Sequence, residues 1–152
     1  MSRSGDSAVP QFGTRLPGQE YIYRPSAYVI LPNDLDQVAI VRTPVGVFLP
    51  GGGQDPGESP EAAAVREVAE ECGFAVELLG SVGVADQFAW SIEASVYYLK
   101  HSTFFRARIV GPARMTETDH ELCWVSREEA GEAVSHESHR WAVSQACGST
   151  TL

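Results

Sequence analysis

The stretch that decides the fold of this chain is Gly52–Phe74, which reads GGQDPGESPEAAAVREVAEECGF. Its glycine-rich start predicts a loop, and the residues after it predict a helix with two defined ends. Ser59 is a good N-cap, and Pro60 stands at the first helical position, where its missing N–H costs nothing. Strong helix formers follow, and Gly73 is placed to end the helix in a left-handed conformation. The segment therefore predicts a capped helix directly after a glycine loop.

Three glutamates of this helix share one face, because Glu67 precedes Glu70 by three residues and Glu71 by four. The opposite side can pack on a sheet and carries small and apolar residues: Ala64, Val65, Val68, Ala69 and Cys72. Three glutamates alone usually form a solvated acidic face. Clustered beside a glycine loop, they offer the hard oxygen ligands that Mg²⁺ and Mn²⁺ prefer. The helix is therefore a candidate metal-binding element.

The spacing of the defined residues is G-x5-E-x7-R-E-U-x-E-E-x-G-U, where U is a bulky apolar residue. It starts at Gly52, passes through Glu58 and Arg66, and ends at Phe74. This pattern resembles the signature of the Nudix hydrolases at every defined position. The preceding residues LPGGG, 49–53, are similar to the loop entry of the MutT-like members. The resemblance covers residues 27–134, although its specificity comes from the signature.

The resemblance implies a role for each matching residue. The metal ligands that it implies are Glu67, Glu70 and Glu71, with Glu58 supporting the metal site. Arg66 orients a glutamate through a salt bridge, and an i, i+4 pair with Glu70 permits this directly. The predicted catalytic residues are Glu67, Glu70, Arg66 and Glu121.

The group that deprotonates the attacking water has several candidates. In the family it is either the glutamate matching Glu67 or an acidic residue from a later loop. The loop before Trp124, TETDHELCW, offers Glu117, Asp119, His120 and Glu121. Glu121 is the preferred candidate and Glu117 the next, and solvation of a surface loop is the alternative for both.

Substrate contacts are predicted at Gly52 and Gly53 of the loop, at Arg42 and at Phe88. An arginine suits phosphate and an aromatic ring suits base stacking, although a surface arginine and a core aromatic residue are the ordinary alternatives. His101, His136 and His139 lack metal-ligand spacing and are expected at the surface.

The implied reaction is hydrolysis of a pyrophosphate bond in a nucleoside diphosphate linked to another group, with Mg²⁺ as cofactor and Mn²⁺ as its substitute. Residues 89–92 carry neither the proline nor the tyrosine that marks two specialised branches of the family. This leaves cleavage of nucleoside triphosphates as the default. The alternative function is a nucleotide-sensing domain without catalysis, but such domains usually lose a metal-ligand glutamate.

The order of the predicted elements favours an α/β/α sandwich with a mixed sheet. Residues 1–20 are expected to be a flexible segment or to form an edge strand, residues 21–147 to form one Nudix domain, and residues 148–152 to be a tail. Pro50–Gly53 is expected to interrupt the sheet as a loop. The predicted strands are 27–31, 37–42, 45–49, 75–90, 93–110 and 122–126, and the later helices are 126–134 and 138–147.

The net charge of −9 over 152 residues argues against nucleic-acid binding, which depends on basic residues that neutralise phosphates. An acidic protein that handles phosphates needs another positive charge, which a divalent metal supplies. Cys72, Cys123 and Cys147 are expected as reduced thiols, in keeping with a cytoplasmic location. No signal peptide or membrane span is predicted. The expected partner is a small nucleotide derivative, and the chain is expected to act alone or as a homodimer.

Overall fold

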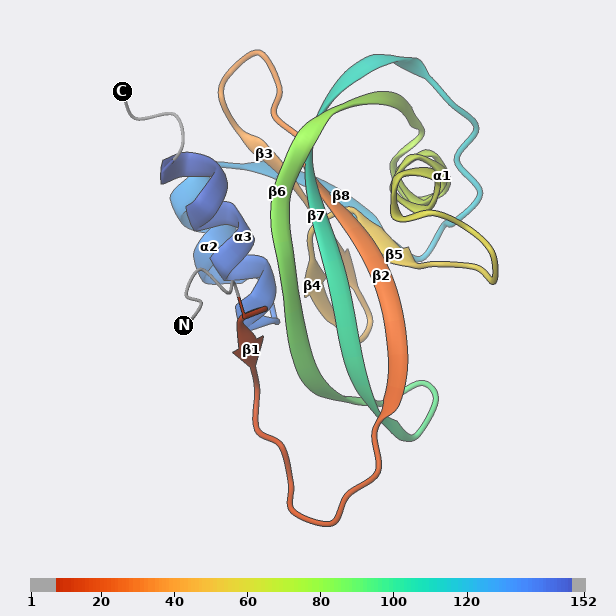
Figure 1. Ribbon diagram of the computed structural model, residues 1–152. Coiled ribbons are helices and arrows are strands. Elements are labelled where there is room, and N and C mark those ends of the chain that lie inside the picture. The colour runs from red at the N-terminus through yellow and green to blue at the C-terminus, as the bar shows by residue number, and fades with distance from the viewer. Residues whose placement is uncertain (1–7, 149–152) are drawn as a thin grey trace.

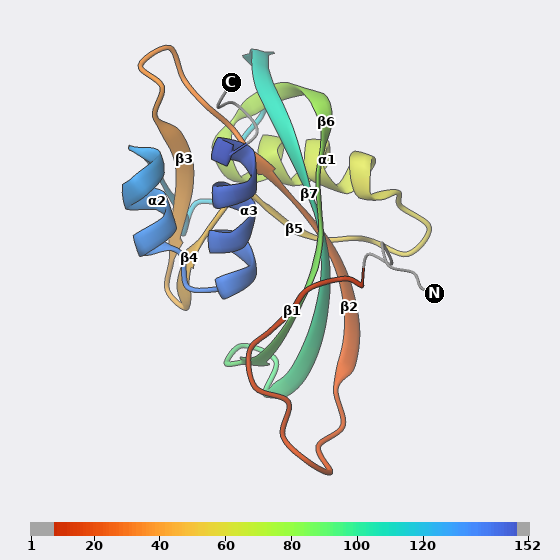
Figure 2. The same cartoon turned by 60° about the vertical axis from the view of Figure 1, so that its left-hand side comes forward.

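Alternating side chains on two strands divide the hydrophobic core between the two faces of the fold. The computed structural model describes residues 8–148. On β2 (Ile22–Ile30), Ala27 and Val29 pack with helix α1 (Pro60–Cys72), whereas Tyr28 and Ile30 pack with α3 (Glu137–Gly148). Strand β3 (Val38–Thr43) divides its side chains in the same way. Both faces are thus covered by helices, α1 on one and α2 and α3 on the other (Figures 1 and 2).

The strands form a mixed five-stranded sheet in the order β1-β6-β7-β2-β5 and a three-stranded sheet in the order β4-β3-β8. In the larger sheet β2 runs parallel to β7, and β6 pairs antiparallel with β7. The predicted α/β/α sandwich with a mixed sheet is confirmed. The remaining elements are β1 (Gln11–Phe12), β4 (Gly46–Phe48), β5 (Gly51–Gly53), β6 (Phe74–Ser91), β7 (Val96–Pro112), β8 (Glu121–Val125) and α2 (Arg127–Ala133).

Helix α1 has both predicted caps. The Ser59 side chain accepts a hydrogen bond from the Ala62 N–H over 3.0 Å. Gly73 adopts φ 74° and donates its N–H to the Ala69 carbonyl over 3.0 Å. The buried face is formed by Ala63, Ala64, Val68 and Cys72, with the Glu71 carboxylate beside them. Val65, expected on this face, is instead 38% exposed, because it lies one residue outside the Ala64-Val68-Cys72 row.

The glycine run forms a strand, so the expectation that it would interrupt the sheet is wrong. Strand β5 pairs antiparallel with β2, with Gly51 opposite Tyr28 and Gly53 opposite Ser26. A Cβ on Gly51 would lie 2.2 Å from the Ala27 carbonyl oxygen. Only a residue without a side chain allows so close an approach, and here φ is also 146°. The glycines therefore allow β5 to pair closely with β2, at the edge of the sheet.

Of the two alternatives for the N-terminal segment, the described part contains the edge strand. Strand β1 pairs parallel with β6, with Gln11 opposite Asp86. Residues 1–7 and 149–152 lie outside the described residues, so the predicted flexible segment and tail stay predictions. Cys72 is buried and Cys123 half-buried, and both are free thiols; the Cys147 side chain is not described. Within residues 8–148, no helix combines the length and hydropathy needed to cross a membrane.

Candidate active site

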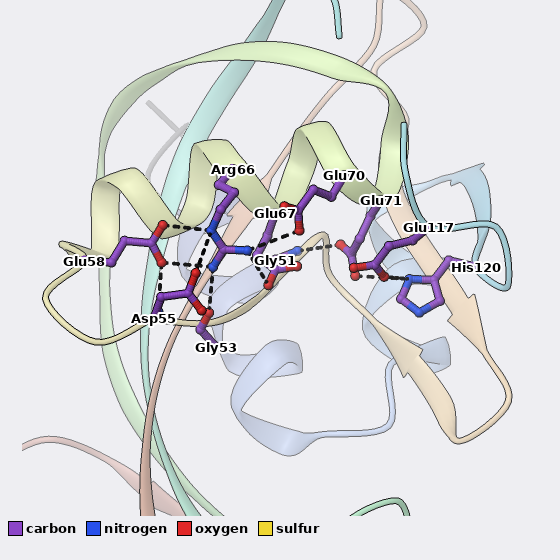
Figure 3. A network of polar contacts seen from close by, with 10 residues as sticks. All are labelled: Gly51, Gly53, Asp55, Glu58, Arg66, Glu67, Glu70, Glu71, Glu117 and His120. Atoms are coloured by element: carbon purple, nitrogen blue, oxygen red, sulfur yellow. Dashed lines mark hydrogen bonds and ion pairs between the residues drawn. The ribbon is translucent and has the colours of Figure 1, made fainter. Parts of the chain in front are cut away.

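The guanidinium of Arg66 contacts carboxylates along α1 and in the loop before it (Figure 3). Its Nε and Nη2 donate to the two carboxylate oxygens of Glu58 over 2.8 and 2.9 Å. Its Nη1 donates to Glu67 Oε2 over 3.2 Å and to Glu70 Oε1 over 3.1 Å. The Nη2 group also donates to the Gly53 carbonyl over 3.1 Å. The planar fork of one arginine thus fixes three glutamates relative to β5.

Glu58 serves as the anchor of this arginine. Its Oε1 also accepts the Asp55 backbone N–H over 2.8 Å. The hydrogen bonds from Arg66 and from Asp55 lower the pKa of Glu58 to about 2, so this carboxylate stays ionised. The hydrogen bonds that Arg66 donates to Glu58 also raise the pKa of Arg66. Both oxygens of Glu58 therefore accept hydrogen bonds from Arg66, and the part that Glu58 takes at a metal site stays a prediction.

The glycines of strand β5 contact the carboxylates of α1. The Gly51 N–H donates to Glu71 Oε1 over 2.9 Å, in a part of the site where Glu71 is only 8% exposed. A Cβ on Gly52 would lie 2.7 Å from the carboxyl carbon of Glu67. The two glycines therefore define how closely the strand approaches the two glutamates. Gly52 and Gly53 are brought to the site as predicted.

The loop after β7 docks on the last turn of α1 and adds a further carboxylate. The N–H groups of Thr116 and Glu117 both donate to the Glu70 carbonyl over 3.0 Å. This contact satisfies an orphan carbonyl at the helix end and positions the loop. Carboxylate oxygens of Glu67, Glu70 and Glu117 then lie within 4.8 Å of one another.

His120 completes a second group with Glu71 and Glu117. Its Nδ1 lies 3.3 Å from Glu71 Oε2 and 3.2 Å from Glu117 Oε1. This buried nitrogen has no partner with hydrogen-bond geometry among the described residues. Ligand atoms of the three residues again lie within 4.8 Å of one another, and Glu117 belongs to both groups. Several carboxylate oxygens and one unpartnered imidazole nitrogen at this spacing fit a divalent cation.

Burial and crowding make two carboxyl groups of this cluster, Glu67 and Glu71, hard to ionise. Burial, with repulsion from Glu117 and Glu70, raises the pKa of Glu67 to about 7 despite the opposing charge of Arg66. Burial likewise raises the pKa of Glu71 to about 8, with further repulsion from the neighbouring glutamates and partial relief from the Gly51 N–H. A bound divalent cation would offset both effects, so the electrostatics also suit a metal site.

Glu121 is not brought to the other glutamates. It starts β8 directly opposite Arg42 of β3, and its side chain is exposed. Because side chains alternate along a strand, Glu121 and Leu122 point to opposite faces, and Leu122 packs in the α1 core. Glu117, the second candidate for the water-activating residue, lies in the cluster instead. Arg42 is exposed and does not line the cavity that Glu71 and His120 border.

Phe88 is also placed away from the carboxylates. It is 7% exposed on β6, and its ring packs edge-on against Tyr21 with centroids 5.0 Å apart. The Arg15 guanidinium covers it from 5.6 Å. Phe88 is therefore a core aromatic residue that the N-terminal segment covers, which is the alternative to a substrate contact.

A cavity of about 130 Å³ leads away from the carboxylates and is lined by Phe48, Glu71, Lys100 and His120, among others. His139 is 1% exposed beside it, so the expectation of a surface residue is wrong for this histidine. Its Nδ1 accepts the Leu49 N–H over 3.1 Å, and burial lowers its pKa well below the ordinary value. The half-buried His136 accepts from Lys100 Nζ over 3.2 Å. No local pattern in the sequence marks Lys100, because a lysine in a strand is ordinary.

Comparison with known proteins agrees with this fold and cluster. A family model described as the NUDIX domain matches residues 22–147. The chain therefore belongs to the NUDIX domain family, as its signature predicted.

Two curated relatives match over shorter stretches. The "Putative 8-oxo-dGTP diphosphatase" of Bacillus subtilis (strain 168) is 39% identical over 79 residues, which are 51% of this chain and 53% of that protein. The "Diphosphoinositol polyphosphate phosphohydrolase 3-alpha" of Mus musculus is 46% identical over 55 residues, 34% of each protein. The matches thus span about half of the first relative and a third of the second.

The solved structures support the fold. A crystal structure of a MutT protein from Methanosarcina mazei Go1 superimposes with a TM-score of 0.69 over 89% of this chain and 100% of that one, at 19% identity. At this identity the likeness shows the fold alone.

Proposed function

We propose that this protein hydrolyses a phosphoanhydride bond of a nucleotide derivative with the aid of divalent cations. The observation that carries the proposal is the convergence of Glu67, Glu70, Glu71, Glu117 and His120 around two overlapping groups of ligand atoms. Mg²⁺ is the proposed cation and Mn²⁺ its substitute, because carboxylates dominate both groups. Once bound, the cation neutralises carboxylates and phosphate together and lowers the pKa of water at the site.

The chain's own residues have distinct tasks in this reaction. Arg66 holds Glu58, Glu67 and Glu70 in fixed orientations, which keeps the site organised before substrate arrives. Either Glu67 or Glu117 accepts the proton of the attacking water, since both carboxylates face the cluster. Oxygen from water bonds to one phosphorus, and the bridging oxygen leaves with the other phosphate. For a nucleoside triphosphate the products are a monophosphate and pyrophosphate.

Nucleoside triphosphates are the first substrates to test. The Bacillus subtilis relative carries the name of an 8-oxo-dGTP diphosphatase and shares 39% identity over 79 residues. The mouse relative is named for diphosphoinositol polyphosphates, which makes inositol pyrophosphates the second class. A sensing domain without catalysis is disfavoured because Glu58, Glu67, Glu70 and Glu71 are all present. A cytoplasmic setting belongs to the same proposal, since the substrates named are soluble metabolites.

The test is a substrate screen with Mg²⁺ and with Mn²⁺ that measures released phosphate and pyrophosphate. The panel contains nucleoside triphosphates, nucleoside diphosphate sugars, dinucleoside polyphosphates and inositol pyrophosphates. We expect cleavage of at least one nucleotide only when a divalent cation is present. Nucleotide binding without any cleavage would support the sensing alternative and overturn the proposal.

A further inference from the structure

Two cations stand side by side on the sheet, on the opposite face from α1. Arg24 of β2 pairs in register with Lys100 of β7. Side chains alternate along a strand, so residues four positions apart point to the same face. Tyr28 and Phe104, four residues after Arg24 and Lys100, both pack in the α3 core, so Arg24 and Lys100 lie on that face. Like charges directly opposite each other destabilise a sheet. In a chain of net charge −9, this pair needs a physical reason.

Among the described residues no carboxylate forms an ion pair with the two cations, and the charge of Glu93 opposes only in part the burial and the Arg24 charge that lower the pKa of Lys100. Within residues 8–148, neither Arg24 nor Lys100 lies within 4.0 Å of a carboxylate oxygen in an ion pair. Glu93 borders the same space without reaching either cation at that distance. Lys100 instead contacts His136 Nε2 over 3.2 Å. Burial and Lys100 itself lower the pKa of His136 to about 4, so this imidazole is neutral and accepts one proton of the ammonium group.

The space between the cations is a polar cavity. It measures about 210 Å³ and is bordered by both cations, by the hydroxyl-bearing residues Ser26, Ser91 and Tyr98, and by Glu93. The Arg24 guanidinium rests on Gly53, where a Cβ would lie 2.2 Å from its Nη2. Cationic groups and hydroxyl donors around one space are the usual elements of a phosphate site.

This cavity communicates with the glutamate cluster around the edge of the sheet. Tyr28, Glu93 and Lys100 border both this cavity and the one that reaches Glu71 and His120. Only the edge strand β5 separates Arg24 from the α1 carboxylates, since Gly53 contacts Arg24 while its carbonyl accepts from Arg66. A ligand held at the glutamates can therefore extend over β5 to the two cations.

We propose that Arg24 and Lys100 form an anion site for a phosphoryl group of the substrate, across β5 from the glutamate cluster. This inference rests on the proposed function, because it places the two phosphates of the cleaved bond at the cluster and a third phosphate at the cations. It narrows the substrate class to molecules with a phosphate beyond the bond that is cleaved, such as nucleoside triphosphates. Nucleoside diphosphates linked to a neutral sugar lack that group.

The test separates the cation pair from metal binding by removing divalent ions with EDTA. Calorimetric titrations with pyrophosphate, dGMP and dGTP would compare the wild type with Lys100→Met and Arg24→Gln. We expect at least a tenfold loss of dGTP affinity in each variant, with a smaller loss for dGMP. Lys100→Arg should retain affinity because it keeps the charge. Arg108→Gln, which removes a cation from the same strand where Arg108 pairs with Glu77, is the matched control.

The three titrations distinguish which anion binds the cation pair, and they separate the anion site from the proposed function. Loss of pyrophosphate binding as well as dGTP binding assigns the site to any phosphoryl anion, and loss for dGTP alone assigns it to the nucleotide. Unchanged dGTP affinity in folded Lys100→Met and Arg24→Gln overturns the anion site, even if the wild type cleaves dGTP. Failure of the wild type to cleave any substrate, with charge-dependent dGTP binding intact, overturns the proposed function and leaves the anion site standing. With active enzyme, KM for dGTP should rise about tenfold while kcat changes little.

Discussion

The two sides of strand β5 carry opposite charges and differ in how clearly the sequence marks them. On the α1 side, Glu67 and Glu70 pair with Arg66, and Glu71 accepts the Gly51 N–H. The pattern G-x5-E-x7-R-E-U-x-E-E-x-G-U predicts all of these glutamates and the arginine. On the other side, Arg24 and Lys100 come from strands far apart in the chain and have no signature. The residues of the family signature thus lie in one continuous segment of the sequence. The residues proposed to select the substrate come close only because their two strands pair in register.

The largest expected effect concerns the glutamates. Glu71→Gln keeps an oxygen for the Gly51 N–H but removes the charge that would bind a cation. We expect a loss in kcat of at least about 100-fold, with little change in thermal stability. The control is Glu61→Gln, an exposed acidic residue in the first turn of the same helix. Equal activity of the two variants would contradict the metal assignment.

Arg66 should come next, because it acts through the glutamates that it orients. Arg66→Gln leaves Glu58, Glu67 and Glu70 without their shared donor. Loss of such an orienting contact typically costs about 10–100-fold in activity or metal affinity. Steady-state kinetics at saturating Mg²⁺, beside a cation titration of each protein, would measure both quantities. If Arg66→Gln matched the wild type in both, the geometry around Arg66 would have no bearing on catalysis.

A smaller effect is expected where β5 touches the helix. Gly52→Ala would place a methyl group 2.7 Å from the Glu67 carboxyl carbon and displace that side chain. We expect about a tenfold loss in kcat, since small displacements in an active site are costly. Gly111→Ala is the control, because no atom would lie within 4 Å of the added Cβ. Similar kinetics for both variants would argue that Glu67 tolerates movement.

The two sides of β5 should also respond to pH with opposite signs, which thermal unfolding of the metal-free protein can measure. The pKa of Glu71 is raised from 4.5 to about 8, so the folded state holds a proton that the unfolded state has released. This contribution to stability is complete below pH 4.5 and is lost as pH rises through about 8. We expect Tm to fall by about 2–4 °C between pH 6.5 and 8. Glu71→Gln should flatten that slope.

Below pH 6.5 two histidines should act in the opposite direction to Glu67 and Glu71, whose pKa values are raised. Burial lowers the pKa of His136 from 6.5 to about 4 and that of His139 well below 6.5. The unfolded state then binds more protons than the folded state, so stability is present above pH 6.5 and is lost as pH falls through about 4. His139→Gln should weaken this acid sensitivity. A Tm difference between the wild type and His139→Gln that stays constant from pH 4 to 6.5 would contradict the buried, neutral imidazole.

Local sequence predicted what depends on local geometry. Helix capping and periodicity predict the Ser59 and Gly73 caps and the shared glutamate face, and the order of the elements predicts the layered fold; the structure contains all of them. The prediction that glycines 51–53 form a loop was wrong, because the turn preference of glycine competes with pairing to β2. That pairing is available only in the assembled sheet. Likewise Glu117 enters the cluster through two backbone hydrogen bonds to the Glu70 carbonyl, a docking that spacing in the loop does not reveal. His139 is buried by distant strands, which is equally invisible from its neighbours in sequence.

Direct measurement of Mn²⁺ binding tests most sharply the claim that the α1 carboxylates hold a divalent cation. Electron paramagnetic resonance of free Mn²⁺ would be followed while the wild type, the double variant Glu70→Gln/Glu71→Gln and the control Glu61→Gln are added at pH 8.5. The wild type and Glu61→Gln should bind Mn²⁺ equally, and the double variant should lose at least about 100-fold in affinity. Equal Mn²⁺ binding by a folded double variant would contradict the account.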